Sequence, residues 1–290
     1  MRLDPGQLET LLVITEQGTF DAAAGELHLT PSAVSQRIRA LERATGQVVV
    51  RRTTPCTATP AGEPLVRLAR QLRLLLTETA ADLPDAAAAV IELAVAVNAD
   101  SLATWFREVL DEVATWPATA LRLDVEDQAY SHDLLRRGDV VGAVTSEPRP
   151  VQGCTAEPLG RLRYTPAATP ELVGRHRRGR GVDWARLPMV VFNEKDRLQD
   201  DVLAERGLGR PPVVHRVPSS ADFHEAVRRG LGWGAIPQPQ LSPDLEAGRL
   251  VALPGGHPVD VPLYWQRWRL DTPALNRLTE TVRRAASVLS

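Results

Sequence analysis

Residues 30–42 read TPSAVSQRIRALE, and this stretch predicts a short helix with two different faces. On a helical wheel Val34, Ile38 and Leu41 share one side, as the 3.6-residue period of a buried face requires. The opposite side carries small hydroxyls, then an amide, then guanidinium groups, an order that suits a helix entering a DNA major groove N-terminus first. Thr30 is a favourable N-cap, and the proline after it costs nothing at the first helical position. We therefore predict a recognition helix.

The polar face of this helix continues into a local cationic patch. Between residues 37 and 52 there are five arginines and one acid, although the whole chain has a formal net charge of -2. A nucleic-acid surface must therefore be local, and a polar face that is merely solvated is the alternative interpretation. The residues expected to contact DNA are Ser32, Ser35, Gln36, Arg37, Arg39, Arg43, Arg51 and Arg52.

The segments on either side of the helix favour the DNA-binding interpretation. Residues 5–16 and 20–27 have helical periodicity, so three short helices follow one another. Residues 47–60 contain a valine run, two arginines and TTPCTATP, which predicts a small β-hairpin or wing. Residues 61–83 predict a long helix whose leucine stripe we expect to pair two chains. The stripe consists of Leu65, Leu68, Leu72, Leu75, Leu76 and Leu83.

Beyond Pro84 and a run of alanines, predicted strands alternate with predicted helices. Strands are expected at 90–97, 121–125, 140–144, 189–192, 213–217, 233–236 and 261–268, and helices at 102–113, 132–137, 198–205, 220–229 and 273–289. This alternation is typical of parallel α/β sheets, and its length suits two lobes. The predicted domains are a winged helix-turn-helix at 1–60, a linker and dimerisation helix at 61–84, and an effector-binding domain at 85–290. Within the last, lobe I is 90–164 plus 265–290 and lobe II is 165–264.

Two parts of the chain carry a family resemblance. TFDAAAGELHLTPSAVSQRIRALE (19–42) resembles the winged helix-turn-helix of LysR-type transcriptional regulators. AVNADSLATW (96–105), RRGDVVGAV (136–144), GLGWGAIP (230–237) and LYWQRW (263–268) resemble the lysine- and arginine-responsive branch, the ArgP and LysG regulators. The resemblance implies a two-lobed effector domain of the type II periplasmic-binding-protein kind and a homodimer or homotetramer on double-stranded DNA. It further implies L-lysine or L-arginine as effector, and control of genes for basic amino-acid export or metabolism.

Ligands of open α/β sheets bind at the carboxyl ends of the strands. The residues at or just after the ends of the predicted strands are Asn98, Asp100, Ser101, Leu102, Glu126, Asp127, Thr145, Ser146, Phe192, Asn193, Ser219 and Ser220. Ten acids and four arginines lie between residues 100 and 147, which favours a cationic effector. Backbone N–H groups near Ser101 and Ser220 are expected to hold a carboxylate. Plain helix caps and solvated strand-end charges are the alternatives for the individual residues.

Composition excludes several other classes of protein. The 290 residues suit about two domains, and two distant cysteines make no disulfide framework. The chain has neither a signal peptide nor a membrane-spanning run, so we expect a cytoplasmic protein. We expect no metal, because the six histidines show no paired spacing, and neither cofactor nor enzymatic activity, because no nucleophile elbow or phosphate loop is present. A soluble two-lobed binding protein or enzyme without DNA binding is the alternative function.

Overall fold

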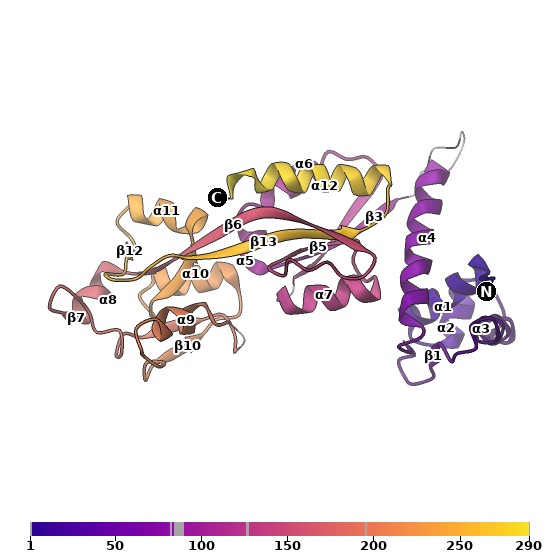
Figure 1. Ribbon diagram of the computed structural model, residues 1–290, viewed down its shortest axis with the longest axis horizontal. Helices are drawn as coiled ribbons and strands as arrows, with labels where there is room; N and C mark the ends of the chain where they lie inside the picture. The colour runs from indigo at the N-terminus through magenta and orange to yellow at the C-terminus, as the bar shows by residue number, and fades with distance from the viewer. Residues whose placement is uncertain (1, 82, 84–89, 126–127, 195, 290) are drawn as a thin grey trace.

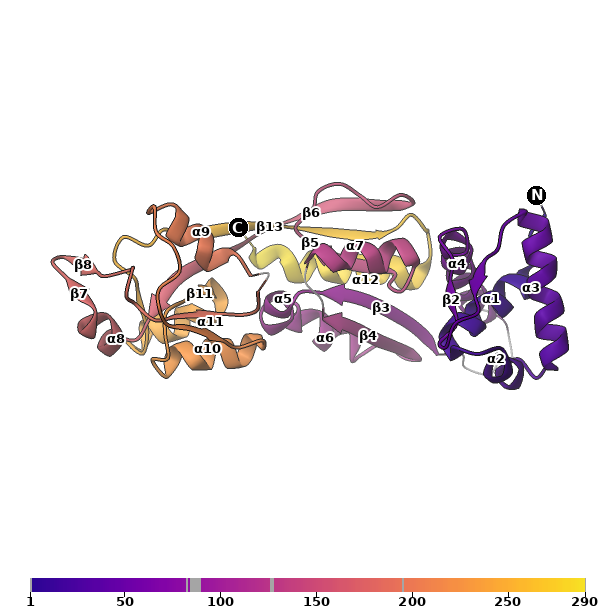
Figure 2. The same ribbon diagram turned by 90° about the horizontal axis from the view of Figure 1, so that it is seen from below.

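The computed structural model describes residues 2–81, 83, 90–125, 128–194 and 196–289. Three parts follow one another along the long axis of the molecule (Figures 1 and 2): an N-terminal helical unit, lobe I and lobe II. The helix α4 (Glu63–Ala81) stands between the N-terminal helices and lobe I. Among the described residues, no helix combines the length and the apolar character needed to cross a bilayer.

The N-terminal unit is a three-helix core with a wing, as the local sequence predicts. Its helices are α1 (Pro5–Gln17), α2 (Phe20–Glu26) and α3 (Pro31–Thr45). The side chains of Asp4, Thr19 and Thr30 cap the three N-termini by accepting backbone N–H hydrogen bonds. Gly46 ends α3 with φ +67°, a left-handed conformation that favours glycine. The wing pairs β1 (Val50–Arg51) with β2 (Thr57–Ala58) in antiparallel fashion.

Lobe I contains the parallel part of the main sheet, in which β3 (Ile91–Val97) lies between β4 (Thr119–Val125) and β5 (Gly142–Thr145). Its helices are α5 (Ala99–Ala103), α6 (Arg107–Val113), α7 (Gln128–Arg137) and α12 (Pro273–Ala285), with the 3-10 turn η1 (Ala286–Val288) after α12. The prediction of a single helix at 102–113 is wrong, because the helix is interrupted between α5 and α6. At the break Trp105 and Phe106 enter the core of lobe I with their rings 5.6 Å apart.

Two long strands join the lobes, and the sheet is therefore mixed and not purely parallel as expected. β6 (Cys154–Ala168) and β13 (Val259–Trp268) pair antiparallel, and both run from one lobe into the other (Figure 1). The complete order is β11-β6-β13-β5-β3-β4, with β12 also on β6. No strand was predicted over β6, because two prolines and a glycine within it lower its apparent strand propensity. The predicted lobe divisions after residues 164 and 264 fall inside these two strands.

Lobe II surrounds the far end of the two strands. Its helices are α8 (Pro170–Arg175), α9 (Leu198–Ala204), α10 (Ser220–Arg228) and α11 (Gln238–Glu246). Its strands are β7 (Arg177–Arg178), β8 (Gly181–Val182), β9 (Met189–Val191), β10 (Val214–Arg216), β11 (Gly234–Pro237) and β12 (Val251–Ala252). The parallel pair β9 and β10 is a separate small sheet whose β9 edge meets Trp233. A Cβ at Gly232 would lie 2.8 Å from the Pro188 carbonyl oxygen, so the turn before β11 needs a glycine.

Candidate functional site

The outer face of α3 carries the polar residues that the sequence places there. Val34, Ile38 and Leu41 are fully buried, and they anchor the helix to α1 and α2. Ser32, Gln36, Arg39 and Arg43 are all exposed. Figures 1 and 2 show α3 on the side of the N-terminal unit that faces away from the lobes. A convex helix with an exposed polar face is the geometry that enters a major groove.

The flanks of α3 are less uniform than its outer face. Ser35 is half-buried, and the Arg37 guanidinium points toward α1, where it donates to the Thr10 hydroxyl at 3.4 Å. At the N-terminus of the helix, the hydroxyl oxygens of Thr30 and Ser32 lie 3.0 Å apart. Arg37 therefore lies at the edge of the outer face of α3.

The wing adds two exposed cations next to α3. Arg51 and Arg52 are exposed on and beside β1, and the Arg52 guanidinium stacks on the Phe20 ring, 4.8 Å from its centroid. This cation–π contact fixes the wing against α2. Within the described part of the chain, no ion pair is formed by Arg39, Arg43, Arg51 or Arg52. Their charge is therefore available to phosphates.

The second candidate site is a cavity of about 410 Å³ where the two lobes meet. Helices α5, α9 and α10 and strands β6, β11 and β13 contribute to its wall. Its lining residues are Asn98, Ala99, Asp100, Ser146, Tyr164, Phe192, Asp196, Arg197, Leu198, Gln199, Asp201, Phe223, Ala235 and Val261. The volume lies in the range of small-molecule pockets, and the wall combines apolar surface with several charged groups.

Asp100 joins the two lobes across this cavity. Its carboxylate accepts hydrogen bonds from the Tyr164 hydroxyl at 3.0 Å and from the Ser220 hydroxyl at 2.7 Å. Asp100 belongs to lobe I, Ser220 begins α10 in lobe II, and Tyr164 lies on β6 between them. Burial raises the pKa of Asp100, while the two hydroxyl donors partly oppose that rise. Burial and the nearby Asp100 carboxylate also raise the pKa of Tyr164 well above 10.

Asp196 supplies a second carboxylate from lobe II. It accepts from the backbone N–H groups of Phe192 at 3.0 Å and Leu198 at 3.1 Å, while its own N–H donates to the Asn193 side chain at 3.0 Å. Burial raises the pKa of Asp196, and the backbone donors partly oppose this. The Gln199 side-chain oxygen, buried in the same wall, has no hydrogen-bond partner among the residues that the structure describes. A buried acceptor without a partner is costly unless a ligand satisfies it.

The structure brings four of the predicted effector residues to the cavity: Asn98, Asp100, Ser146 and Phe192. Ser220 does not line the cavity but bonds to Asp100, which does. A second hollow of about 540 Å³, beside α5 and α10, is lined in part by Leu102, Ser219 and Ser220. Glu126 and Asp127 lie outside the described residues.

The remaining predicted residues are buried or serve local structure. Ser101 and Thr145 are fully buried behind the cavity wall. The Ser101 N–H donates to the Asn98 side-chain oxygen at 2.7 Å, so the free N–H expected there for a carboxylate is already used. Asn193 accepts from the Asp196 N–H and shapes the loop without lining the cavity. Ser219 caps α10.

Sequence reasoning missed Tyr164, Asp196, Arg197 and Gln199. The prediction covers only the first residues after each predicted strand, whereas Asp196, Arg197 and Gln199 lie five or more positions beyond the end of β9. The asparagine at 193 was the available signal, because an Asn side chain that bonds a later backbone N–H turns the chain back. Tyr164 lies on β6, which was not predicted at all.

Comparisons with known proteins give a consistent result over the whole chain. The family model "Bacterial regulatory helix-turn-helix protein, lysR family" matches residues 5–63, and the model "LysR substrate binding domain" matches residues 87–287. The lysine export transcriptional regulatory protein LysG of Corynebacterium glutamicum is 49% identical over 288 residues, covering 98% of each chain.

Two solved structures match nearly end to end. Full-length LysG from C. glutamicum with bound effector arginine matches with a TM-score of 0.86 and 48% identity over 98% of each chain. The crystal structure of ArgP from Mycobacterium tuberculosis matches with a TM-score of 0.91 and 44% identity over 99% of each chain.

Proposed function

The chain belongs to the LysR family of bacterial helix-turn-helix regulators, and from that premise we propose that it controls transcription in response to L-lysine or L-arginine. We propose the cleft between the lobes as the effector site and α3 with the wing as the operator-reading surface. The genes it controls are those of basic amino-acid export or metabolism. A regulator acts where the chromosome is, so we retain the cytoplasm as its proposed location.

The charge arrangement of the cleft carries the effector assignment. Two partly buried carboxylates, Asp100 and Asp196, line the same cavity, and burial, which disfavours their charged form, raises the pKa of both. A cation between them offsets that cost. Arg197 is the one guanidinium in the described lining and supplies a partner for an α-carboxylate. An amino acid with a cationic side chain satisfies both requirements, and a 48% identical relative holds arginine.

The DNA-binding surface is proposed from exposure and charge. The base-reading positions are Ser32, Ser35 and Gln36, and the phosphate-contacting positions are Arg39, Arg43, Arg51 and Arg52, with Arg37 at the margin. The hydroxyls and the amide lie toward the N-terminus of α3, which enters the groove first.

Dimerisation through α4 is proposed from its exposed leucines. Leu68, Leu75 and Leu76 of α4 are 39%, 37% and 58% exposed, and Leu83, just after the helix, is 61% exposed, whereas Leu65 is buried against the N-terminal helices. A groove of about 340 Å³ between α1 and α4, lined in part by Leu72 and Leu76, offers space for a second copy. Pairing would set the spacing of two recognition helices on a palindromic operator. Contacts between sensor lobes would complete a tetramer.

Titration calorimetry with matched ligands tests the effector assignment. L-arginine and L-lysine should bind, whereas L-citrulline and L-norleucine, which keep the shape but lack the side-chain charge, should bind at least about 30-fold more weakly. Equal binding of arginine and citrulline would contradict the charge argument. A gel shift with a DNA site selected from a random library, with and without the amino acid, tests regulation. A chain that binds the amino acid but no DNA would be a binding protein, and turnover of the amino acid would make it an enzyme.

A further inference from the structure

Helix α4 is joined to lobe I by several directional contacts. Arg67 donates to the Gln152 carbonyl at 2.9 Å, and Arg70 donates to the Arg137 carbonyl at 3.1 Å. Nearer the C-terminal end of α4, the Glu78 carboxylate accepts from the Ala274 N–H in the first turn of α12 at 2.9 Å. The contacts extend over three turns of the helix, so α4 docks lengthwise on lobe I.

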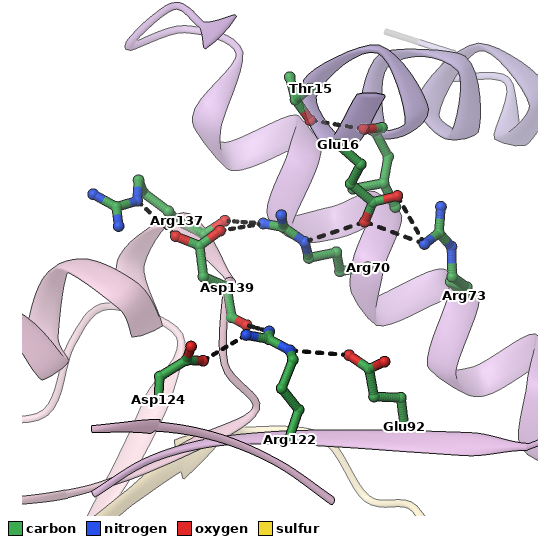
Figure 3. A network of polar contacts seen from close by, with 10 residues as sticks. Thr15, Glu16, Arg70, Arg73, Glu92, Arg122, Asp124, Arg137 and Asp139 are labelled. Carbon is green, nitrogen blue, oxygen red and sulfur yellow. Dashed lines mark hydrogen bonds and ion pairs between the residues drawn. The ribbon is translucent and has the colours of Figure 1, made fainter. Parts of the chain in front are cut away.

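Arg70 holds a central position in this junction (Figure 3). Its guanidinium lies 2.9 Å from the Asp139 carboxylate of lobe I and 4.0 Å from the Glu16 carboxylate of α1. Arg73, one turn later on α4, contacts Glu16 at 3.1 Å and has no described contact with lobe I. Arg70 therefore connects the N-terminal unit with lobe I, whereas Arg73 stays within the N-terminal unit.

The polar contacts continue from Asp139 into the sheet. The Asp139 carbonyl accepts from Arg122 at 2.6 Å, and Arg122 also contacts Glu92 and Asp124. Arg122 lies on β4, at the edge of the main sheet. In the other direction, α1 packs directly on α3. A continuous set of charged groups thus reaches from the sensor sheet to the helix that supports the recognition helix.

The junction combines apolar and polar contacts. Leu74 of α4 is buried in the core of lobe I, and a hollow of about 580 Å³ lies next to it, lined in part by Arg70 and Asp139. The side chains of Arg70 and Asp139 are 22% and 26% exposed, so their attraction is only partly screened by water. The Arg70–Asp139 pair therefore adds a directional, partly shielded contact to this packing.

We propose that Arg70 is a positioning residue that stabilises this arrangement of the N-terminal unit on lobe I, and that the effector changes DNA affinity through this arrangement. The proposal rests on the function proposed above. A ligand in the cleft can change DNA affinity only through a difference between two arrangements of the whole molecule. When the contact to Asp139 is lost, the effector still binds and α3 still binds DNA, but the two events lose their coupling.

The matched variants are Arg70→Met and Asp139→Asn, with Arg73→Met as the control on the same helix. The measured quantity is the ratio of DNA affinities with and without saturating L-arginine, on a site selected with the wild-type chain. We expect the effector-induced ratio to fall by at least about fivefold in the first two variants, and to stay within about twofold in Arg73→Met. Arginine affinity by calorimetry should stay within about twofold in all three. A wild-type ratio in Arg70→Met, or an equal loss in Arg73→Met, would overturn the proposal.

A second measurement separates this proposal from the proposed function. Amide hydrogen exchange of residues 138–141 in the ligand-free chain should rise in Arg70→Met and in Asp139→Asn, stay unchanged in Arg73→Met, and be partly restored in Arg70→Lys. If the wild-type chain responds to no amino acid, the proposed function is wrong, while this exchange pattern would still support the contact between α4 and lobe I through Arg70 and Asp139. Unchanged exchange in Arg70→Met would overturn the proposed role of Arg70, whatever the effector is.

Discussion

The two ends of the molecule present opposite kinds of charge in opposite ways. On α3 and the wing, cations such as Arg39 and Arg51 stand exposed on a convex surface, and they form no ion pair with any residue that the structure describes. In the cleft, Asp100 and Asp196 are withdrawn into a concave wall, where burial raises their pKa values. The exposed arginines of α3 and the wing suit DNA, a large polyanion that remains hydrated when it binds. The buried carboxylates of the cleft suit a small cation that loses its hydration shell on binding.

This difference predicts that the two sites respond to different variables. Binding at exposed arginines releases counterions from DNA and therefore depends on salt. Binding at buried carboxylates depends on their ionisation and therefore on pH. Four experiments test whether the comparison holds.

Replacing Asp196 should have the largest effect. Asp196→Asn keeps the size of the side chain but removes one of the two charges that face the effector, leaving the ligand cation poorly paired. We expect L-arginine binding to weaken by about 2–5 kcal/mol in calorimetry. Asp201→Asn is the control, because Asp201 also lines the cavity but is exposed. Equal losses in both variants would mean that burial does not distinguish these carboxylates.

Replacing Gln36 should affect only specific DNA. Gln36→Ala removes an exposed amide from the outer face of α3, and we expect a loss of about 1–3 kcal/mol on the cognate site. Binding to random DNA should be unchanged in fluorescence anisotropy. A comparable loss on random DNA would make Gln36 a contact to the backbone and not to bases.

Lowering the pH should weaken effector binding. Burial raises the pKa of Asp100 and Asp196 above the usual value of about 3.9, so both take up protons at a higher pH than exposed aspartates. Since the effector cation pairs with the ionised form, its affinity should fall on acidification by up to about tenfold per pH unit for each carboxylate. Calorimetry between about pH 7.5 and about pH 5 measures this. Asp196→Asn should flatten the profile, and a wild-type affinity that rises on acidification would contradict the assignment.

Removing one wing cation should have the smallest effect, and it should be visible mainly in the salt dependence. Arg52→Ala should lower the slope of log affinity against log salt by about one unit, on any DNA sequence. Arg178→Ala, which removes an exposed arginine from β7 at the far end of lobe II, is the matched control. A reduced slope in the control would extend the DNA surface to lobe II.

The N-terminal unit was predictable because its signals are local. The caps at Thr19 and Thr30, the glycine at 46 and the 3.6-residue period of α3 each act within a few residues, and the predicted family and fold class are confirmed. The cleft was only partly predictable, because it is assembled from segments far apart in the sequence. Asn98 and Asp100 directly follow a strand, whereas Asp196 reaches the cavity only after its loop turns back on Asn193.

The paired strands β6 and β13 determine how the lobes can move. Both strands pass without interruption from one lobe to the other, with a register shift between Leu263 and Tyr264. Relative motion of the lobes must then flex a double-stranded ribbon, whose hydrogen bonds survive small changes of twist. Such a ribbon permits small changes in the angle between the lobes and opposes large ones, because large ones would break its hydrogen bonds. It returns to its original twist when the ligand no longer holds the lobes in another arrangement. A sensor suspended in this way resets itself once the amino acid leaves.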